Sequence, residues 1–283
     1  MKKVIISSII FLIVLISFFF LFNNKRKEYT YKIIEEYYSN SNNEKIYTRL
    51  YKPITNKNIP IVIYSHGLGA TYRAATDYAE YLAKKGIATL SFDFRGGSDR
   101  SKSDGKTTNM SIMTECDDLE FIISKVKEFN FIDKDKIILM GSSQGGAVSA
   151  LISSKHNDIK GTVLLYPAIG LFSFVHNMYS SIDKVPEEFS FSDDSIIVGK
   201  NYFTDIWNIN PYDILKNDTK EIVIIQGTAD RVVPVTQARE LNELYKNSTL
   251  YEIEGAPHGF NDKYFDEAIK YVDRYLKNIE VMR

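Results

Sequence analysis

A glycine-flanked serine stands where an apolar run gives way to a helical pattern. The segment Gly141-Ser142-Ser143-Gln144-Gly145-Gly146 has the form G-x-S-x-G and follows the apolar stretch 136–140. Glycines two residues before and two residues after a serine let a strand and a helix pass closely, so the serine is held in a strained turn with its hydroxyl exposed. The spacing therefore predicts that Ser143 is a nucleophile, with a purely structural glycine-rich turn as the alternative.

An alkyl hydroxyl is a poor nucleophile at neutral pH, so Ser143 needs a general base, and that base needs an acid to hold its tautomer. In proteins built around such a serine turn, the acid and then the histidine follow the serine along the chain. His258, in the loop after the last expected strand, has this order, and Asp230 follows the apolar strand 221–226. We expect a Ser143–Asp230–His258 triad; a solvent-facing histidine and an ordinary Asx turn or N-cap are the structural alternatives.

A second glycine-rich junction follows the expected strand 59–65. Its sequence is Ser65-His66-Gly67-Leu68-Gly69-Ala70. Attack by a serine on a carbonyl group creates an oxyanion, and the donors expected to stabilise it are the backbone N–H groups of Gln144 and Leu68. His66 is expected to shape this loop by hydrogen bonding rather than to act as a base.

The elements that must position these junctions are strands alternating with helices. From about residue 28 onward, short β-rich runs alternate with amphipathic stretches, a pattern typical of a layered α/β domain with a largely parallel sheet. Active sites of such sheets lie at the carboxyl ends of the strands. Strands are expected at 31–38 and 45–51, as an antiparallel pair, and at 59–65, 87–94, 136–140, 161–166, 221–226 and 249–253. Helices are expected at 72–85, 112–129, 144–154, 235–246 and 262–277.

From about Glu44 onward the chain resembles the α/β-hydrolase superfamily, and most of all its cinnamoyl and feruloyl esterases. Besides the segments 66–69 and 141–146, the resemblance rests on Gln226-Gly227-Thr228-Ala229-Asp230-Arg231-Val232-Val233-Pro234, Gly255-Ala256-Pro257-His258-Gly259-Phe260 and Phe92-Asp93-Phe94-Arg95-Gly96-Gly97-Ser98 with Ser103-Asp104-Gly105. It implies an α/β-hydrolase fold, with a mostly parallel central sheet flanked by helices. One departure is Ser142, where relatives often have histidine.

The leading functional hypothesis is a serine hydrolase that cleaves small-molecule carboxylic esters through an acyl-enzyme, with no metal and no organic cofactor. No H-E-x-x-H spacing is present. A prolyl- or aminopeptidase-type serine peptidase, a lipase or monoacylglycerol hydrolase, and a catalytically inactive binding module are the alternatives.

The stretch 170–211, between a core strand and the strand that carries the acid, is irregular and rich in aromatic residues. The resemblance implies that it is a lid insertion over the serine. Phe172 and Trp207 are then expected to line a substrate pocket, with Asp193, Asp194 or Asp205 as partners of a substrate hydroxyl. The alternative is a satellite hydrophobic core beneath a long loop.

Composition excludes several other classes of protein. The 283 residues are 44% apolar and 25% charged, which excludes a disordered or collagen-like chain. With 35 basic and 36 acidic residues the net charge is −1, so nucleic acid is not an expected partner. The one cysteine, Cys116, cannot form an internal disulfide and argues against redox or structural zinc chemistry.

The N-terminal residues differ sharply from the rest of the chain. Residues 4–22 are apolar apart from three serines and are flanked by Lys2-Lys3 on one side and by Lys25-Arg26-Lys27 on the other. As a helix they would reach about 28 Å, close to the thickness of a bilayer core. We expect residues 1–27 to be an uncleaved membrane anchor, with the hydrolase domain 28–283 outside the cytoplasmic membrane; a cleaved signal peptide and a soluble core helix are the alternatives. No oligomeric state is predicted.

Overall fold

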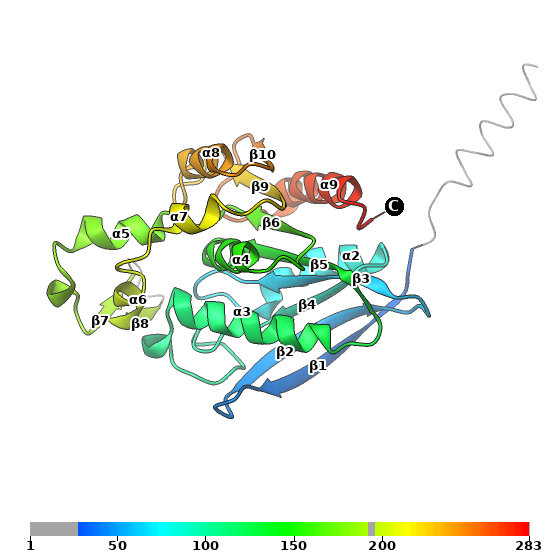
Figure 1. The fold of residues 1–283 in the computed structure, drawn as a ribbon, viewed down its shortest axis with the longest axis horizontal. Helices are drawn as coiled ribbons and strands as arrows, with labels where there is room; N and C mark the ends of the chain where they lie inside the picture. The colour runs from blue at the N-terminus through cyan, green and yellow to red at the C-terminus, as the bar shows by residue number, and fades with distance from the viewer. Residues whose placement is uncertain (1–27, 192–195, 283) are drawn as a thin grey trace, which may run out of the picture.

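The computed structural model describes residues 28–191 and 196–282, and an eight-stranded sheet forms their centre (Figure 1). The strand order is β1-β2-β4-β3-β5-β6-β9-β10, with β2 antiparallel to both β1 and β4 and the remaining pairs parallel. The strands are β1 (Tyr31–Ser39), β2 (Lys45–Pro53), β3 (Ile59–Ser65), β4 (Ala88–Phe92), β5 (Ile132–Ser142), β6 (Gly161–Leu165), β9 (Glu221–Gly227) and β10 (Ser248–Ile253).

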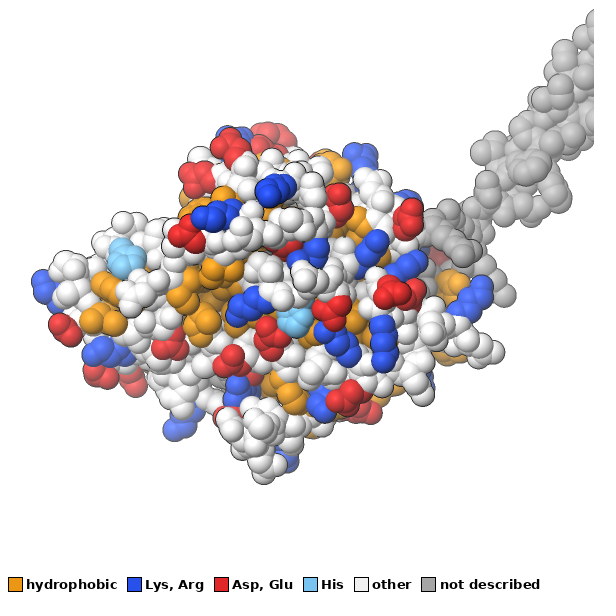
Figure 2. All heavy atoms as spheres, viewed as in Figure 1, with side chains coloured by type: hydrophobic (Ala, Val, Ile, Leu, Met, Phe, Trp, Pro, Cys, Tyr) orange, Lys and Arg blue, Asp and Glu red, His pale blue; other side chains and the backbone are white. Residues whose placement is uncertain are grey.

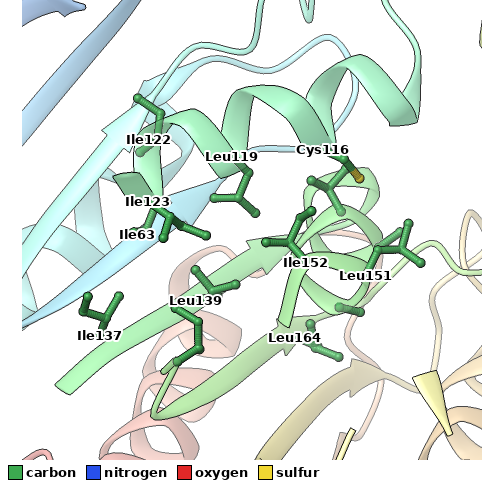
Figure 3. Close-up of a cluster of buried hydrophobic side chains, with 14 of the residues drawn as sticks. Ile63, Cys116, Leu119, Ile122, Ile123, Ile137, Leu139, Leu151, Ile152 and Leu164 are labelled. Atoms are coloured by element: carbon green, nitrogen blue, oxygen red, sulfur yellow. The ribbon is translucent and has the colours of Figure 1, made fainter. Parts of the chain in front are cut away.

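Helices cover both faces of this sheet because successive strand residues point to opposite sides. In β5, for example, Ile137 and Leu139 belong to one buried cluster, whereas Ile138 and Met140 belong to another. The first cluster packs against α3 (Ile112–Lys127), α4 (Gln144–Lys155) and α8 (Val235–Leu244), and Figure 3 shows part of it between the sheet and α3 and α4. The second packs against α2 (Thr76–Lys84) and α9 (Asp262–Asn278).

The elements expected from the sequence are present at the expected places, so the predicted fold class is confirmed. The two largest differences concern boundaries. The expected helix 72–85 begins as a 3₁₀ turn, Tyr72–Ala75, before α2, and the expected strand 136–140 extends over Ile132–Ser142. A short 3₁₀ turn, Thr107–Asn109, precedes α3.

The insertion between β6 and β9 lies beyond one end of the sheet (Figure 1). It contains α5 (Leu171–Met178), a 3₁₀ turn (Ile182–Lys184), the hairpin strands β7 (Glu188–Ser190) and β8 (Ile197–Gly199), α6 (Asn201–Thr204) and α7 (Pro211–Leu215). Val175, Val185, Val198, Tyr202 and Phe203 form a separate buried cluster together with Met110 and Ile196. The satellite core that the sequence analysis gave as the alternative is therefore present under this insertion.

Two of the expectations lie outside the described residues. They are the membrane anchor, residues 1–27 with its span 4–22, and the substrate contacts of Asp193 and Asp194. Across the part of the chain that the structure describes, no helix combines the length and apolar character needed to cross a bilayer. Acidic and basic side chains are interspersed over the described surface that Figure 2 shows.

Candidate active site

Ser143 forms the turn between β5 and α4, and its backbone is strained. Its φ of 52° and ψ of −121° lie outside the regions that non-glycine residues normally adopt. The flanking glycines are sterically required. A Cβ atom on Gly141 would lie 2.1 Å from the carbonyl oxygen of Gly145, and a Cβ on Gly145 would lie 2.3 Å from the carbonyl oxygens of Ser65 and His66. The G-x-S-x-G spacing thus lets β5, α4 and the loop after β3 meet behind the serine.

The peptide group that follows Ser143 is held in one orientation. The Ser143 carbonyl oxygen accepts hydrogen bonds from the N–H groups of Gly146 (3.0 Å), Ala147 (3.2 Å) and Ala168 (3.0 Å). Because a trans peptide is planar, the N–H of Gln144 must point the opposite way. Within the described residues, neither this N–H nor that of Leu68 donates to a protein acceptor. Both residues line the same cavity as Ser143, as an oxyanion hole requires.

His258 lies between Ser143 and Asp230. Its Nε2 is 3.1 Å from Ser143 Oγ, and its Nδ1 is 2.8 Å from Asp230 Oδ2. A carboxylate at Nδ1 selects the tautomer with the proton on Nδ1, which leaves Nε2 free to accept the serine proton. The structure therefore brings together the three residues that the sequence analysis assigned to a triad, from the ends of β5 and β9 and the loop after β10.

Asp230 is held in turn by its own loop. Oδ1 accepts the N–H groups of Val232 (2.9 Å) and Val233 (2.8 Å), and Oδ2 accepts Nε2 of Gln226 (3.1 Å). Burial alone would raise the pKa of Asp230, but the hydrogen bonds from His258 and the backbone of Val233 and Val232 outweigh it, and the pKa lies below its ordinary value. The carboxylate is thus ionised at neutral pH and can stabilise an imidazolium.

Residues that the sequence analysis did not assign complete the surroundings of the triad. Tyr166, at the end of β6, packs edge-on against His258 with ring centroids 4.8 Å apart and an interplanar angle of 64°. Gln226 holds Asp230 from the end of β9. Tyr166 and Gln226 each stand at the carboxyl end of a parallel strand, and this position was the signal that could have found them.

His66 has the structural role expected of it. The ring is 1% exposed, with Nδ1 2.8 Å from the carbonyl oxygen of Gly67, and Nε2 accepts the N–H of Phe94 at 3.1 Å. Burial lowers the pKa of His66, which keeps the ring neutral. This bridge between the loops after β3 and β4 positions Gly67, where an added Cβ would lie 3.1 Å from Ser143 Cβ.

A cavity of about 710 Å³ opens beside Ser143 and His258. Its wall is largely apolar. The apolar lining residues are Leu68, Ala168, Leu171, Phe174, Phe191, Ile196, Tyr202, Val232 and Val233, and the polar ones beyond Ser143, Gln144 and His258 are Asp99, Arg100 and Gln237. Ester-sized ligands fit a cavity of this volume.

The insertion supplies part of this wall, but not with the side chains expected from the sequence. Phe172 is 3% exposed and packs into the main core, and it is Leu171 and Phe174 of α5 that line the cavity. Trp207 packs against His176, with ring centroids 4.5 Å apart, and does not line the cavity. Asp205 accepts the Ser111 hydroxyl at 2.6 Å and is also absent from the wall. These three assignments are corrected.

No group of three or more histidine, cysteine, aspartate or glutamate side chains in the described ranges is arranged to hold a metal ion. The groups that meet at the site are a hydroxyl, an imidazole, a carboxylate and, within the described residues, two backbone N–H groups without a protein acceptor. A mostly parallel sheet with helices on both faces, carrying these groups at its strand ends, defines an α/β hydrolase.

Comparison with known proteins finds solved structures with the same fold and a sequence family that matches part of the chain. Residues 56–189 match the sequence family described as "Serine aminopeptidase, S33". Est1E from Butyrivibrio proteoclasticus, solved with ferulic acid bound, superposes with a TM-score of 0.78 at 24% identity, over 87% of this chain and 99% of that one. The Pyrococcus furiosus esterase Pf2001 gives a TM-score of 0.66 at 26% identity, over 88% and 91% of the two chains. The chain has the α/β-hydrolase fold, and the resemblance to the feruloyl esterases is confirmed at the level of the fold.

A curated relative is also similar over part of its length. The quorum-quenching protein AidA of Acinetobacter baumannii is 29% identical over 135 residues, which are 47% of this chain and 43% of AidA. The chain thus spans less than half the length of this relative.

Proposed function

We propose that the protein is a carboxylic-ester hydrolase that works through an acyl-enzyme intermediate. The observation that carries this proposal is the continuous chain from Asp230 Oδ2 through His258 to Ser143 Oγ, with distances of 2.8 and 3.1 Å, beside two backbone N–H groups without a protein acceptor in the described residues. Similarity to solved esterases supports the reaction class.

Each group has one role in the proposed reaction. Ser143 Oγ forms a bond to the ester carbonyl carbon while its proton passes to His258 Nε2. The carbonyl oxygen becomes an oxyanion that accepts the N–H groups of Leu68 and Gln144, and each such donor is typically worth about 3–4 kcal/mol in the transition state. The C–O bond to the alcohol then breaks, and the proton on His258 goes to the departing alcohol oxygen.

Hydrolysis of the acyl-enzyme repeats these steps with water as the nucleophile. His258 takes a proton from water as its oxygen bonds to the acyl carbon, and Ser143 leaves as the protonated hydroxyl when its bond to that carbon breaks. The net reaction converts an ester and water to an acid and an alcohol, and no cofactor enters the balance.

The cavity wall favours an apolar group on the substrate. Phe174 on α5 and Val232 beside Asp230 are 36% and 68% exposed, although both are hydrophobic, and both line the cavity. An apolar substrate group covering them would gain about 25 cal/mol for each Å² removed from water. We therefore propose esters with an apolar acyl or aryl group as the substrate class, which includes the lipid-like esters considered above.

Peptide hydrolysis is the second candidate, because the matching sequence family is described as a serine aminopeptidase. An aminopeptidase site needs a carboxylate to bind the substrate's α-ammonium group. Asp99 at the cavity is the one acidic lining residue besides the catalytic groups in the described part of the chain, and its side chain is 77% exposed and 3.9 Å from Arg100. A carboxylate that is exposed to solvent and paired with a cation binds an ammonium group only weakly. The residues that line the cavity therefore favour ester substrates over peptides.

Two measurements on the full chain test the proposal. Labelling by a fluorophosphonate probe, with Ser143→Ala as control, reports whether the serine is activated. Turnover of p-nitrophenyl acyl esters and methyl ferulate is then compared with turnover of aminoacyl-naphthylamides. Ester turnover that exceeds amide turnover by orders of magnitude is expected; faster turnover of the naphthylamides would replace the ester assignment by a peptidase, and absence of labelling would indicate an inactive binding module.

The location of the enzyme is proposed from residues 1–27 alone. Their apolar sequence supports an anchor in the cytoplasmic membrane. Basic residues stand on both sides of the apolar run, so the hydrolase domain is placed on the outer side because short N-terminal anchors commonly have that arrangement. Protease added to intact cells would digest the domain if it lies outside, whereas a cytoplasmic domain would survive until the cells are lysed.

A further inference from the structure

The insertion is attached to the catalytic core by hydrogen bonds around the N-terminal end of α3. Asn201 Nδ2 donates to the carbonyl oxygen of Met110 at 3.1 Å, and the hydroxyl of Ser111 donates to Asp205 at 2.6 Å. β8 also passes close to the turn before α3, since a Cβ on Gly199 would lie 2.0 Å from the carbonyl oxygen of Thr108. α6 is therefore fixed against the core where it meets the active site.

Tyr202 on α6 reaches from this attachment to the residue after the nucleophile. Its hydroxyl donates to Oε1 of Gln144 at 2.5 Å, and both side chains are 1% exposed. The ring of Tyr202 packs edge-on against Phe191 and Phe203, at centroid distances of 5.8 and 5.2 Å. The phenol is thus held by packing on one side and by one short buried hydrogen bond on the other.

The orientation of the Gln144 side chain matters for the proposed oxyanion hole, because the backbone N–H of the same residue is one of the two donors of that hole. Oε1 is a strong acceptor, and a buried acceptor that loses its donor is costly. Within the described residues, the N–H groups of Leu68 and of Gln144 itself donate to no protein acceptor, and both residues line the cavity. A glutamine side chain released from Tyr202 could turn its oxygen toward those donors and occupy the place meant for the substrate oxyanion.

We propose that Tyr202 is a positioning residue that holds the side-chain oxygen of Gln144 out of the oxyanion hole. It does not touch the reacting atoms and acts through Gln144. The insertion thereby has a second role besides forming the cavity wall, since it keeps the two N–H donors available. This inference rests on the proposed acyl-transfer function.

The variant that isolates the hydrogen bond is Tyr202→Phe in the full chain, which keeps the ring and its packing. We expect kcat for p-nitrophenyl acetate to fall about tenfold with little change in KM, because the oxyanion hole stabilises the transition state rather than the bound substrate. The inhibition constant of a trifluoromethyl ketone, whose adduct with serine carries an oxyanion, should rise by a similar factor. Tyr179→Phe is the matched control, since this ring also packs on Phe203 but does not line the cavity.

A double-mutant cycle separates positioning from a general structural effect. In a Gln144→Leu background, which keeps the backbone N–H and removes the side-chain oxygen, Tyr202→Phe should have no further effect on kcat. Gln144→Met provides the same background if the leucine variant is poorly folded by circular dichroism. Activity of Tyr202→Phe within twofold of the unmodified protein, or an equal loss in both backgrounds, would overturn the inference.

The rate of fluorophosphonate labelling tests the same hole without an ester substrate, because the phosphoryl oxygen occupies the oxyanion position. If the unmodified protein labels but hydrolyses no ester, the proposed function fails while the labelling rates of the variants still decide the role of Tyr202. If the unmodified protein does not label, no functional oxyanion hole exists and both proposals fall.

Discussion

His258 Nδ1 lies 2.8 Å from Asp230 Oδ2, and this contact joins the loop after β10 to the loop after β9. Two backbone N–H groups hold the other carboxylate oxygen of Asp230, so the carboxylate has a fixed direction. The edge-on packing of Tyr166 restricts the imidazole from the side. The geometry of the base is thus set before any substrate binds.

Asp230→Asn is expected to lower ester turnover by up to about four orders of magnitude while leaving the fold intact. An amide at this position can stabilise the wrong imidazole tautomer and cannot stabilise the imidazolium. Steady-state turnover of a short p-nitrophenyl ester and circular dichroism measure the two effects. A folded variant with more than a tenth of the original turnover would show that Asp230 is not the orienting acid.

Ser143→Ala and His258→Ala should each lower turnover by at least about 10³-fold, and the double variant should be scarcely worse than either alone. Without the base the hydroxyl stays protonated, and without the hydroxyl the base has nothing to activate. Ser142→Ala, at the neighbouring serine of the same turn, is the control for disturbance of the elbow. Additive losses in the double variant would mean that the two residues do not act as one unit.

Phe174→Ser and Val232→Ser should each reduce kcat/KM for p-nitrophenyl decanoate about tenfold while changing turnover of the acetate less than twofold. A long acyl chain loses apolar contact worth about 0.8 kcal/mol for each methylene left in water, whereas an acetyl group has no methylene to lose. Ile197→Ser is the matched control, since Ile197 is 46% exposed on the same insertion but does not line the catalytic cavity. Equal losses on both esters would assign these residues to stability rather than to substrate binding.

The free energy of unfolding of the Glu115→Gln variant, compared with that of the unmodified protein, is expected to increase between about pH 5 and pH 8. Glu115 is fully buried, and burial raises the pKa of its carboxyl well above the ordinary value, so the folded state keeps a proton that the unfolded chain releases above about pH 4.5. Rising pH therefore favours the unfolded state of the unmodified protein, but not of the glutamine variant.

Urea unfolding at pH 5 and pH 8 measures this difference in the free energy of unfolding. Glu128→Gln, which removes a charge from the exposed C-terminal end of α3, is the control for a general charge effect. A difference between Glu115→Gln and the unmodified protein that stays constant with pH would mean that the buried carboxyl is ionised in the folded state.

Deletion of residues 1–27 should move the enzyme from the membrane fraction to the supernatant without reducing ester turnover. The catalytic groups all lie beyond residue 65, and the described domain begins with β1 at Tyr31. Fractionation of cells expressing the full and shortened chains, followed by an ester assay of each fraction, measures both effects. A full-length chain found wholly in the supernatant would contradict an uncleaved anchor.

Much of the fold and the chemistry could be predicted from local sequence. Glycine is required at positions 141 and 145, because a Cβ atom at either position would lie closer than 2.5 Å to a backbone oxygen. Such steric requirements give a short sequence pattern that can be recognised. Apolar runs of strand length alternating with amphipathic stretches predict a covered parallel sheet, since each strand must bury both of its faces. With the chain order of serine, acid and histidine, these patterns were enough to place Ser143, Asp230 and His258 just after expected strands.

Tertiary structure alone decided which side chains of the insertion face the substrate cavity. α5 is apolar on two faces, so composition could not distinguish Phe172, which enters the main core, from Phe174, which lines the cavity. Tyr202 and Gln144 are 58 residues apart, and their hydrogen bond depends on how α6 packs against the start of α3. Such contacts between distant segments leave no periodic or local signal, because they are selected by the shape of the packed surfaces rather than by neighbouring residues along the chain.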